Sequence, residues 1–139
     1  MIKHIVFDMD NTLVDEFGST TRPGIIDFLT NLKNKNLHLY LWTNSTKIRA
    51  KEILLYHKLH TYFDKCIYRE DYDPLNKGIH KDITKISGEL LIDDDPSEIE
   101  FVKMLGYKGY LIKPYRKNSK LKAIDYNKEY GEIIKVIHY

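Results

Sequence analysis

The sequence has little of several features that mark particular classes of protein. Its single cysteine, Cys66, excludes an internal disulfide framework, and a zinc site built on two or more thiolates is not expected. No stretch approaches the roughly 18 apolar residues that a membrane-spanning helix needs. The apolar start of the chain reaches Asp8 and Asp10 too soon for a signal peptide. We therefore expect a cytoplasmic protein without a membrane contact.

An excess of charge of one sign is also absent, because 22 Lys and Arg residues stand against 20 Asp and Glu residues. This balance excludes a polybasic arm that binds nucleic acid by bulk charge alone, and it excludes an acidic tail. No linker rich in Pro, Gly or Ser divides the 139 residues, of which 42% are hydrophobic. We predict one domain over residues 1–139 with its own core, and the composition indicates no oligomeric state.

Short apolar runs alternate with amphipathic ones along the chain. We expect strands at residues 2–7, 37–42, 66–68, 90–92 and 109–112. Helices are expected from Pro23, over roughly 80–86, from Asp95 to Gly106, and in the tail from Asn127. A further helix is expected from Asn44 or Ser45 to about His57, and its expected core residues are Ile48, Ile53, Leu54 and Leu55. This alternation predicts an α/β protein with a three-layer, Rossmann-like arrangement around a central parallel sheet of about five strands.

Acidic and hydroxyl-bearing residues follow three of the expected strands. They are Asp8 and Asp10 after the first strand, Thr43 and Asn44 after the second, and Asp93 and Asp94 after the fourth. In a parallel sheet, ligands bind just beyond the carboxyl ends of the strands. We therefore expect these side chains to meet at one edge of the sheet.

The acidic residues indicate a metal site. Asp8 and Asp10 are costly together unless a positive charge lies between them, and oxygen ligands of this kind suit Mg²⁺. An aspartate can also attack phosphorus as a nucleophile. Asp93 and Asp94 could complete the site, one binding the ion and the other holding a ligand or water, while Asp95 caps the next helix. An isolated pair of this kind would be a solvated turn, but here the pairs recur at several strand ends.

Thr43 and Asn44 precede an expected helix, where free backbone N–H groups bind phosphate, although ordinary helix capping is the alternative. A lysine near the start of the segment at 80–86 could neutralise both an aspartate nucleophile and a phosphoryl group. We favour Lys81 for this role, with Lys77 and Lys85 as alternatives.

The ordered set of residues resembles the four motifs of the haloacid dehalogenase (HAD) superfamily of phosphotransferases. The motifs are Phe7-Asp8-Met9-Asp10-Asn11-Thr12-Leu13, Trp42-Thr43-Asn44-Ser45, Lys81 and Ile92-Asp93-Asp94. Further features are similar to the capless branch that includes phosphatases of the RNA polymerase C-terminal domain: Arg22-Pro23-Gly24, Lys81-Asp82-Ile83 and Asp93-Asp94-Asp95-Pro96. The resemblance spans residues 1 to about 112.

The resemblance implies specific roles for the acidic residues. Asp8 would be the nucleophile and a Mg²⁺ ligand. Asp10 would protonate the leaving oxygen, then activate water, and offer its backbone carbonyl to the metal. Asp94 would bind the metal directly, with Asp93 as its support.

The resemblance also implies a binding site for the phosphoryl group. Thr43 and Asn44 would hold the phosphoryl oxygens, and Lys81 would steady their charge. We group Thr12, the threonine of the first motif, with these substrate-binding residues.

The two places where a cap domain could be inserted are short, so we expect an open site and no cap. An open site suits a phosphate carried by a protein, a nucleotide or a nucleic-acid end. The basic stretch from Lys113 to Lys122 follows the fifth expected strand. Lys113, Arg116 and Lys117 could therefore contact a polyanion at the same edge, although a solvated loop is the alternative.

These inferences lead to three hypotheses. The first is a Mg²⁺-dependent phosphatase that acts through an aspartyl-phosphate on a macromolecular phosphosubstrate. The alternative is a phosphatase of nucleotides or nucleic-acid ends, which the basic stretch favours. The third is a binding module that kept the fold and lost catalysis, against which the complete set of motif acids argues.

Overall fold

The computed structural model describes residues 1–118 and 123–138 of the chain. Its centre is a parallel sheet of five strands in the order β3-β2-β1-β4-β5. The strands are β1 (His4–Phe7), β2 (His38–Trp42), β3 (Lys65–Ile67), β4 (Leu90–Asp93) and β5 (Lys108–Leu111). The predicted α/β class and the number of strands are therefore confirmed.

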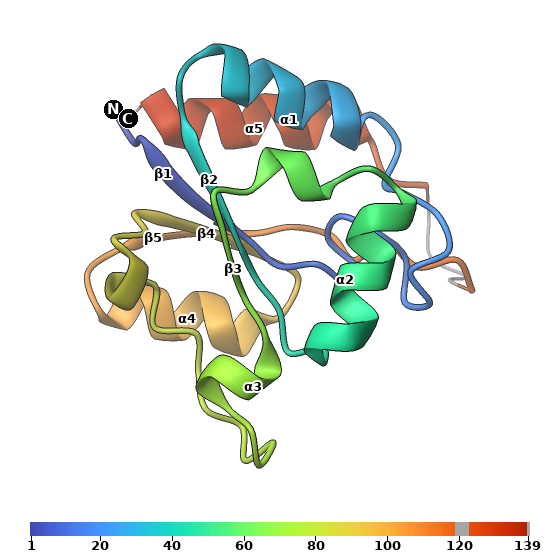
Figure 1. Cartoon of the computed structure of the whole chain (residues 1–139). Helices are drawn as coiled ribbons and strands as arrows, with labels where there is room; N and C mark the ends of the chain where they lie inside the picture. The colour runs from blue at the N-terminus through green and yellow to red at the C-terminus, as the bar shows by residue number, and fades with distance from the viewer. Residues whose placement is uncertain (119–122, 139) are drawn as a thin grey trace.

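Helices cover both faces of this sheet, which makes three layers (Figure 1). The helices are α1 (Ile25–Asn34), α2 (Lys47–Tyr56), α3 (Arg69–Tyr72), α4 (Pro96–Met104) and α5 (Tyr126–His138), and the short 3₁₀ helices are η1 (His60–Tyr62) and η2 (Ile83–Ile86). The buried residues of α1, α2 and α5 form one core cluster, whereas those of η2 and α4 form another. The sheet separates the two clusters.

The central strands are apolar on both sides because both faces of the sheet are covered. In β1, Ile5 and Phe7 belong to the cluster under α1 and α5, whereas Val6 belongs to the cluster under α4. Neighbouring side chains of a strand point to opposite faces, so this division follows from strand geometry. Continuous apolar runs such as residues 90–92 are therefore the signature of buried parallel strands.

Three helix starts differ from the sequence-based expectation. Helix α1 begins at Ile25 and not at Pro23, because Gly24 stands before it with a left-handed φ of 78°. A side chain on Gly24 would also meet the Tyr130 ring at 3.0 Å. Helix α2 is preceded by Thr46 as its N-cap, so neither Asn44 nor Ser45 caps it. The expected helix at 80–86 is reduced to η2, and Lys81 lies in the segment before it.

The expected core of α2 was wrong at two positions. Ile48 and Leu55 are 76% and 58% exposed, whereas Ile53 and Leu54 are buried as expected. The helix has apolar residues on both its inner and its outer side, so apolar character alone does not identify the buried face.

Strands β1 and β4 are neighbours, and the strand order reverses between them. Ligands bind in the crevice at such a reversal, beyond the carboxyl ends of the strands. In the part of the chain that the structure describes, no inserted domain interrupts the connections from β1 to α1 and from α2 to β3. Within the described residues, no helix has both the length and the apolar character needed to cross a membrane.

Candidate active site

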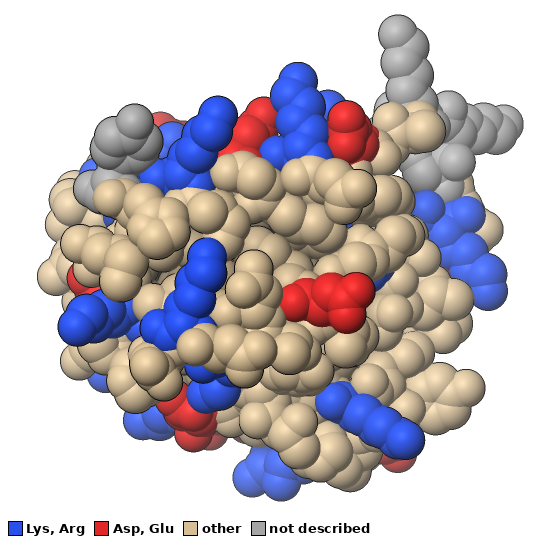
Figure 2. Space-filling model, turned by 90° about the horizontal axis from the view of Figure 1, so that it is seen from above, with Lys and Arg blue, Asp and Glu red and all other residues tan. Residues whose placement is uncertain are grey.

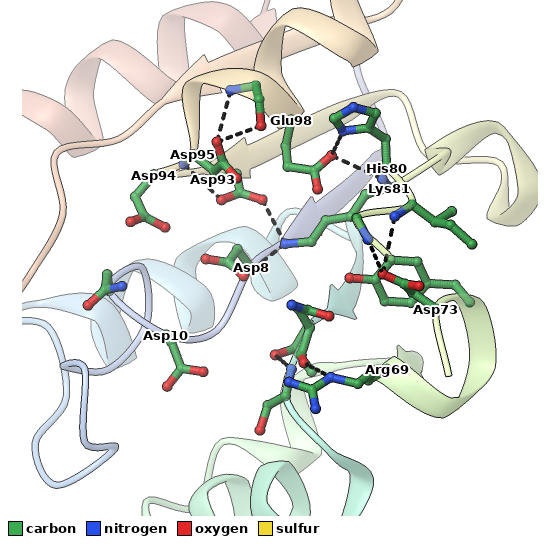
Figure 3. A pocket seen from close by; sticks show the side chains of 18 of the residues that line it. Asp8, Asp10, Arg69, Asp73, His80, Lys81, Asp93, Asp94, Asp95 and Glu98 are labelled. Atoms are coloured by element: carbon green, nitrogen blue, oxygen red, sulfur yellow. Dashed lines mark hydrogen bonds and ion pairs between the residues drawn. The ribbon is translucent and has the colours of Figure 1, made fainter. Parts of the chain in front are cut away.

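A cleft of about 810 Å³ opens at the carboxyl edge of the sheet (Figure 3). The loops after β1, β2 and β4 and the segment before η2 all contribute to its walls. The predicted site residues that line it are Asp8, Asp10, Thr43, Asn44, Lys81, Asp93 and Asp94. The parallel topology thus places every predicted catalytic, substrate-binding and metal-binding residue except Thr12 on the wall of the cleft.

Lys81 lies between two buried carboxylates. Its Nζ donates to Asp8 Oδ1 at 2.9 Å and to Asp93 Oδ2 at 2.7 Å, and its side chain is 4% exposed. The alternative lysines, Lys77 and Lys85, are both exposed and neither lines the cleft. The lysine at the centre of the site is therefore Lys81.

Burial shifts the ionisation of this group. Burial raises the pKa of Asp8 to about 6 and that of Asp93 to about 7, and the Lys81 ammonium only partly offsets this. For Lys81 itself, burial acts to lower the pKa, but the charges of Asp8 and Asp93 outweigh it and raise the pKa. Lys81 thus stays charged. Its single positive charge cannot neutralise all the carboxylates around it.

The surplus negative charge comes from three carboxylates. Asp8, Asp93 and Asp94 each bring one oxygen to within 4.8 Å of the others. Both oxygens of Asp93 already accept hydrogen bonds, one from Lys81 and one from the backbone N–H of Asp95 at 3.0 Å. Burial also raises the pKa of the half-buried Asp94. A hard divalent cation fits this donor set of three carboxylates.

Asp10 lies apart from this cluster (Figure 3). Its Oδ1 and Oδ2 each accept a hydrogen bond of 2.8 Å from the guanidinium of Arg49, which comes from α2. We did not predict Arg49 from the sequence. Its place in the first turn of the helix that follows Ser45 is the signal that could have indicated it.

Thr12 acts on Asp8 and does not line the cleft. It is fully buried, and its Oγ1 donates to Asp8 Oδ2 at 3.1 Å. Because Lys81 binds the other oxygen, both oxygens of Asp8 have a fixed donor. The orientation of the Asp8 carboxylate is therefore determined from two sides.

Thr43 and Asn44 lie on the wall of the cleft that leads to α2. Thr43 is 1% exposed, and its Oγ1 accepts the backbone N–H of Ser45 at 3.0 Å. A hydroxyl that accepts can still donate, so Thr43 can bind an oxygen of a ligand. The backbone carbonyl of Asn44 accepts from Arg69 Nε at 2.8 Å. Arg69 is a further basic residue of the cleft that the sequence did not single out.

Two other acids hold the backbone before Lys81 and at Lys81 itself, and we did not predict them. The buried Asp73 accepts the backbone N–H groups of residues 77–79 at 2.8, 2.9 and 3.1 Å. Glu98, from α4, accepts the backbone N–H of Lys81 at 3.1 Å and pairs with His80 Nδ1 at 2.8 Å. These contacts fix the loop that carries Lys81 into the cleft.

The basic segment after β5 lies beside the loop that carries Asp10. The backbone N–H of Tyr115 donates to the carbonyl of Asn11 at 2.8 Å, and Arg116 Nε lies 3.6 Å from Glu16. Lys113, Arg116 and Lys117 do not line the cleft itself, and Lys120 and Lys122 lie outside the described residues. On the face over α1 and α5, the Lys and Arg side chains of the described residues are scattered (Figure 2).

Comparison with known proteins identifies one family. The family model of NLI interacting factor-like phosphatases matches residues 3–135, which include every residue of the candidate site. None of the curated proteins compared with the chain matches it.

Solved structures share the fold at low sequence identity. A HAD-superfamily hydrolase from Ehrlichia chaffeensis is 16% identical, with a TM-score of 0.64 and 98% of each chain covered. A HAD-superfamily hydrolase of subfamily IA, variant 1, from Geobacter sulfurreducens PCA is 14% identical, with a TM-score of 0.66, 98% of this chain and 100% of that chain covered. A hydrolase from Streptococcus pneumoniae TIGR4 is also 14% identical, with a TM-score of 0.63, 81% of this chain and 94% of that chain covered. These similarities establish the HAD fold.

Proposed function

This chain belongs to the family of NLI interacting factor-like phosphatases, and on that premise we propose that it hydrolyses phosphate monoesters with Mg²⁺ through an aspartyl-phosphate on Asp8. The enzyme class follows from the family. The metal, the covalent intermediate and the substrate are the proposal. The observation that carries it is the buried contact of Lys81 with Asp8 and Asp93, beside Asp94.

In the first step, an oxygen of Asp8 attacks phosphorus, forming a new P–O bond while the bond to the leaving oxygen breaks. Thr12 and Lys81 support this step because they orient the carboxylate before substrate arrives. Lys81 also places a positive charge next to the oxygen that meets the phosphoryl group. Phosphoryl transfer depends mainly on positioning and charge neutralisation of this kind.

Asp10 acts as the acid in the first step and as the base in the second. It gives a proton to the leaving oxygen, so that an alcohol departs, and the Asp10 carboxylate then accepts a proton from the attacking water. The new P–O bond from water releases Asp8 as a carboxylate and phosphate as product, which returns Asp10 to its acid form. The wall formed by Thr43 and Asn44 would hold the phosphoryl oxygens meanwhile.

The residues that would hold Mg²⁺ are Asp8 and Asp94, with Asp93 as support and the backbone carbonyl of Asp10 as a further ligand. When bound, the ion supplies positive charge to the phosphoryl oxygens and to the carboxylates around them. Three carboxylates facing one ammonium leave a charge that a divalent cation balances. This balance supports a divalent ion, and the hard oxygen donors favour Mg²⁺.

The open edge supports a phosphate displayed on a large molecule. Lys113, Arg116 and Lys117 come from the segment that contacts the loop carrying Asp10, and they would bind a polyanionic partner. A phosphorylated protein and a nucleic-acid end both fit this surface. Comparing phosphopeptides with nucleotides and with 3′- or 5′-phosphorylated oligonucleotides would distinguish them.

The decisive experiment measures hydrolysis of p-nitrophenyl phosphate with Mg²⁺ and with a chelator. We expect chelation to abolish turnover and Asp8→Asn to reduce it by at least about 10³-fold. Asp27→Asn, an exposed position in the first turn of α1, is the matched control and is expected to keep full activity. Turnover retained by Asp8→Asn would show that another residue attacks phosphorus, and a wild-type protein without activity would favour a binding module.

A further inference from the structure

The guanidinium of Arg49 binds the carboxylate of Asp10 with two parallel hydrogen bonds. Nη1 lies 2.8 Å from Oδ2, and Nη2 lies 2.8 Å from Oδ1. Such two-bond contacts fix the orientation of a carboxylate as well as its position. We propose that Arg49 is the positioning residue that keeps Asp10 directed into the cleft for proton transfer to the leaving group. This proposal rests on the function proposed above.

The guanidinium is itself held by two further contacts. Nη1 also donates to Ser45 Oγ at 3.0 Å, and Nη2 lies 3.4 Å from the backbone carbonyl of Glu16. Ser45 in turn donates its backbone N–H to the hydroxyl of Thr43. Arg49 therefore connects the loop that would bind the phosphoryl group with the side chain that would protonate the leaving oxygen.

Arginine can position the Asp10 carboxylate, but it cannot take part in the proton transfer itself. A guanidinium carries five N–H donors and no acceptor, so Arg49 cannot take the proton from Asp10. Since both oxygens of Asp10 are engaged, one of the two bonds has to open when that oxygen serves the leaving group. The remaining bond keeps the carboxyl group facing the cleft.

A purely structural role fits the contact less well. The side chains of Arg49 and Asp10 are 39% and 28% exposed. Ion pairs with this exposure contribute little to folding stability. The contact therefore contributes more to the geometry of the cleft than to the stability of the core.

The test compares substrates whose leaving groups differ in their need for a proton. p-Nitrophenol leaves readily as an anion, whereas phenol and simple alcohols need an acid. We expect Arg49→Met to lower kcat/KM for phenyl phosphate by about ten-fold or more, with less than about two-fold change for p-nitrophenyl phosphate. Arg49→Lys keeps the charge but cannot form the two-bond contact, so we expect a smaller loss with the same dependence on the leaving group.

A double-mutant cycle separates positioning from other roles. In the Asp10→Asn background, Arg49→Met is expected to cause no further loss with phenyl phosphate. Lys51→Met removes a positive charge from an exposed site on the same helix and serves as the matched control. Thermal unfolding of each variant checks that it is folded.

Three results would overturn the proposal: an equal loss with both substrates, the same loss in the Asp10→Asn background, or a gain with phenyl phosphate. Each of them would leave the proposed function intact if wild-type turnover needs Mg²⁺ and Asp8. Failure of the proposed function is recognised separately, because Asp8→Asn would then keep its activity.

Discussion

Nζ of Lys81 lies 2.9 Å from Oδ1 of Asp8, although 73 positions separate the two residues in the sequence. Asp8 follows β1, whereas Lys81 comes from the segment before η2. The contact also reaches Asp93 at the end of β4. The candidate site is therefore assembled from three separate segments, and only folding brings Asp8 to the other two residues.

Replacing the central lysine is expected to damage both activity and stability. Lys81→Met leaves the Asp8 and Asp93 carboxylates without their buried partner, which costs about 3–5 kcal/mol of unfolding free energy. We also expect at least about a 10²-fold loss of kcat. Urea unfolding and hydrolysis of p-nitrophenyl phosphate measure the two effects. The exposed Lys85→Met is the control, and if it lost activity to the same extent, the assignment of Lys81 would be wrong.

Metal binding is expected to depend on Asp94. Asp94→Asn removes a carboxylate from the cluster with Asp8 and Asp93, and we expect the affinity for Mg²⁺ to fall by at least about ten-fold. Titration calorimetry measures the change. Asp95→Asn is the matched control, since asparagine also caps helices and the Asp95 side chain accepts from Ser97 in α4. Equal affinities of the two variants would place the ion elsewhere.

The contribution of Asp8 and Asp93 to stability without metal is expected to fall as the pH rises. Burial raises the pKa values of Asp8 and Asp93 to about 6 and about 7, above the value of about 3.9 in an unfolded chain. Through these two groups the folded protein binds more protons than the unfolded chain between about pH 4 and pH 7, so their contribution to the unfolding free energy decreases across that range.

The same ionisation controls the effect of Mg²⁺, because the ion binds carboxylates in their charged form. The increase in Tm that Mg²⁺ causes is therefore expected to be larger at about pH 8 than at about pH 5. Thermal unfolding with and without the ion at both pH values provides the measurement. An equal increase at both values would mean that the buried carboxylates do not bind it.

The basic segment after β5 is expected to contribute to large substrates only. Changing both Arg116 and Lys117 to Ala removes two positive charges beside the loop that carries Asp10. We expect kcat/KM for a phosphorylated oligonucleotide or phosphopeptide to fall by about ten-fold at low salt, with little change for p-nitrophenyl phosphate. Changing the exposed Lys103 and Lys108 to Ala is the control. A similar loss with small and large substrates would exclude docking at this segment.

The local pattern of the chain predicted all five strands but fewer details of the helices. The strands were recognisable because a covered parallel sheet requires continuous apolar runs such as Leu90 to Ile92. The buried face of α2 was not, because Ile48 and Leu55 are as apolar as Ile53 and Leu54 but lie on the outside. Which side of a short helix is buried depends on what packs against it.

Residues that act through a partner were harder to recognise than residues at strand ends. Asp8, Thr43 and Asp93 could be grouped from the sequence, because parallel strands deliver their carboxyl ends to one edge. Thr12 was grouped with the substrate-binding residues, yet its hydroxyl donates to Asp8 from a fully buried position. Nothing local indicates that contact, since it depends on the course of the turn after β1.

The sequence by itself determined an α/β sheet with acids and hydroxyl groups gathered at one edge, because hydrophobic periodicity and the residues after each strand are local properties. Only the tertiary structure determined that Lys81 contacts Asp8 and that Arg49 binds Asp10. Each of these contacts joins segments far apart in the chain. Their geometry follows from how the helices and loops pack on the sheet, which no local pattern specifies.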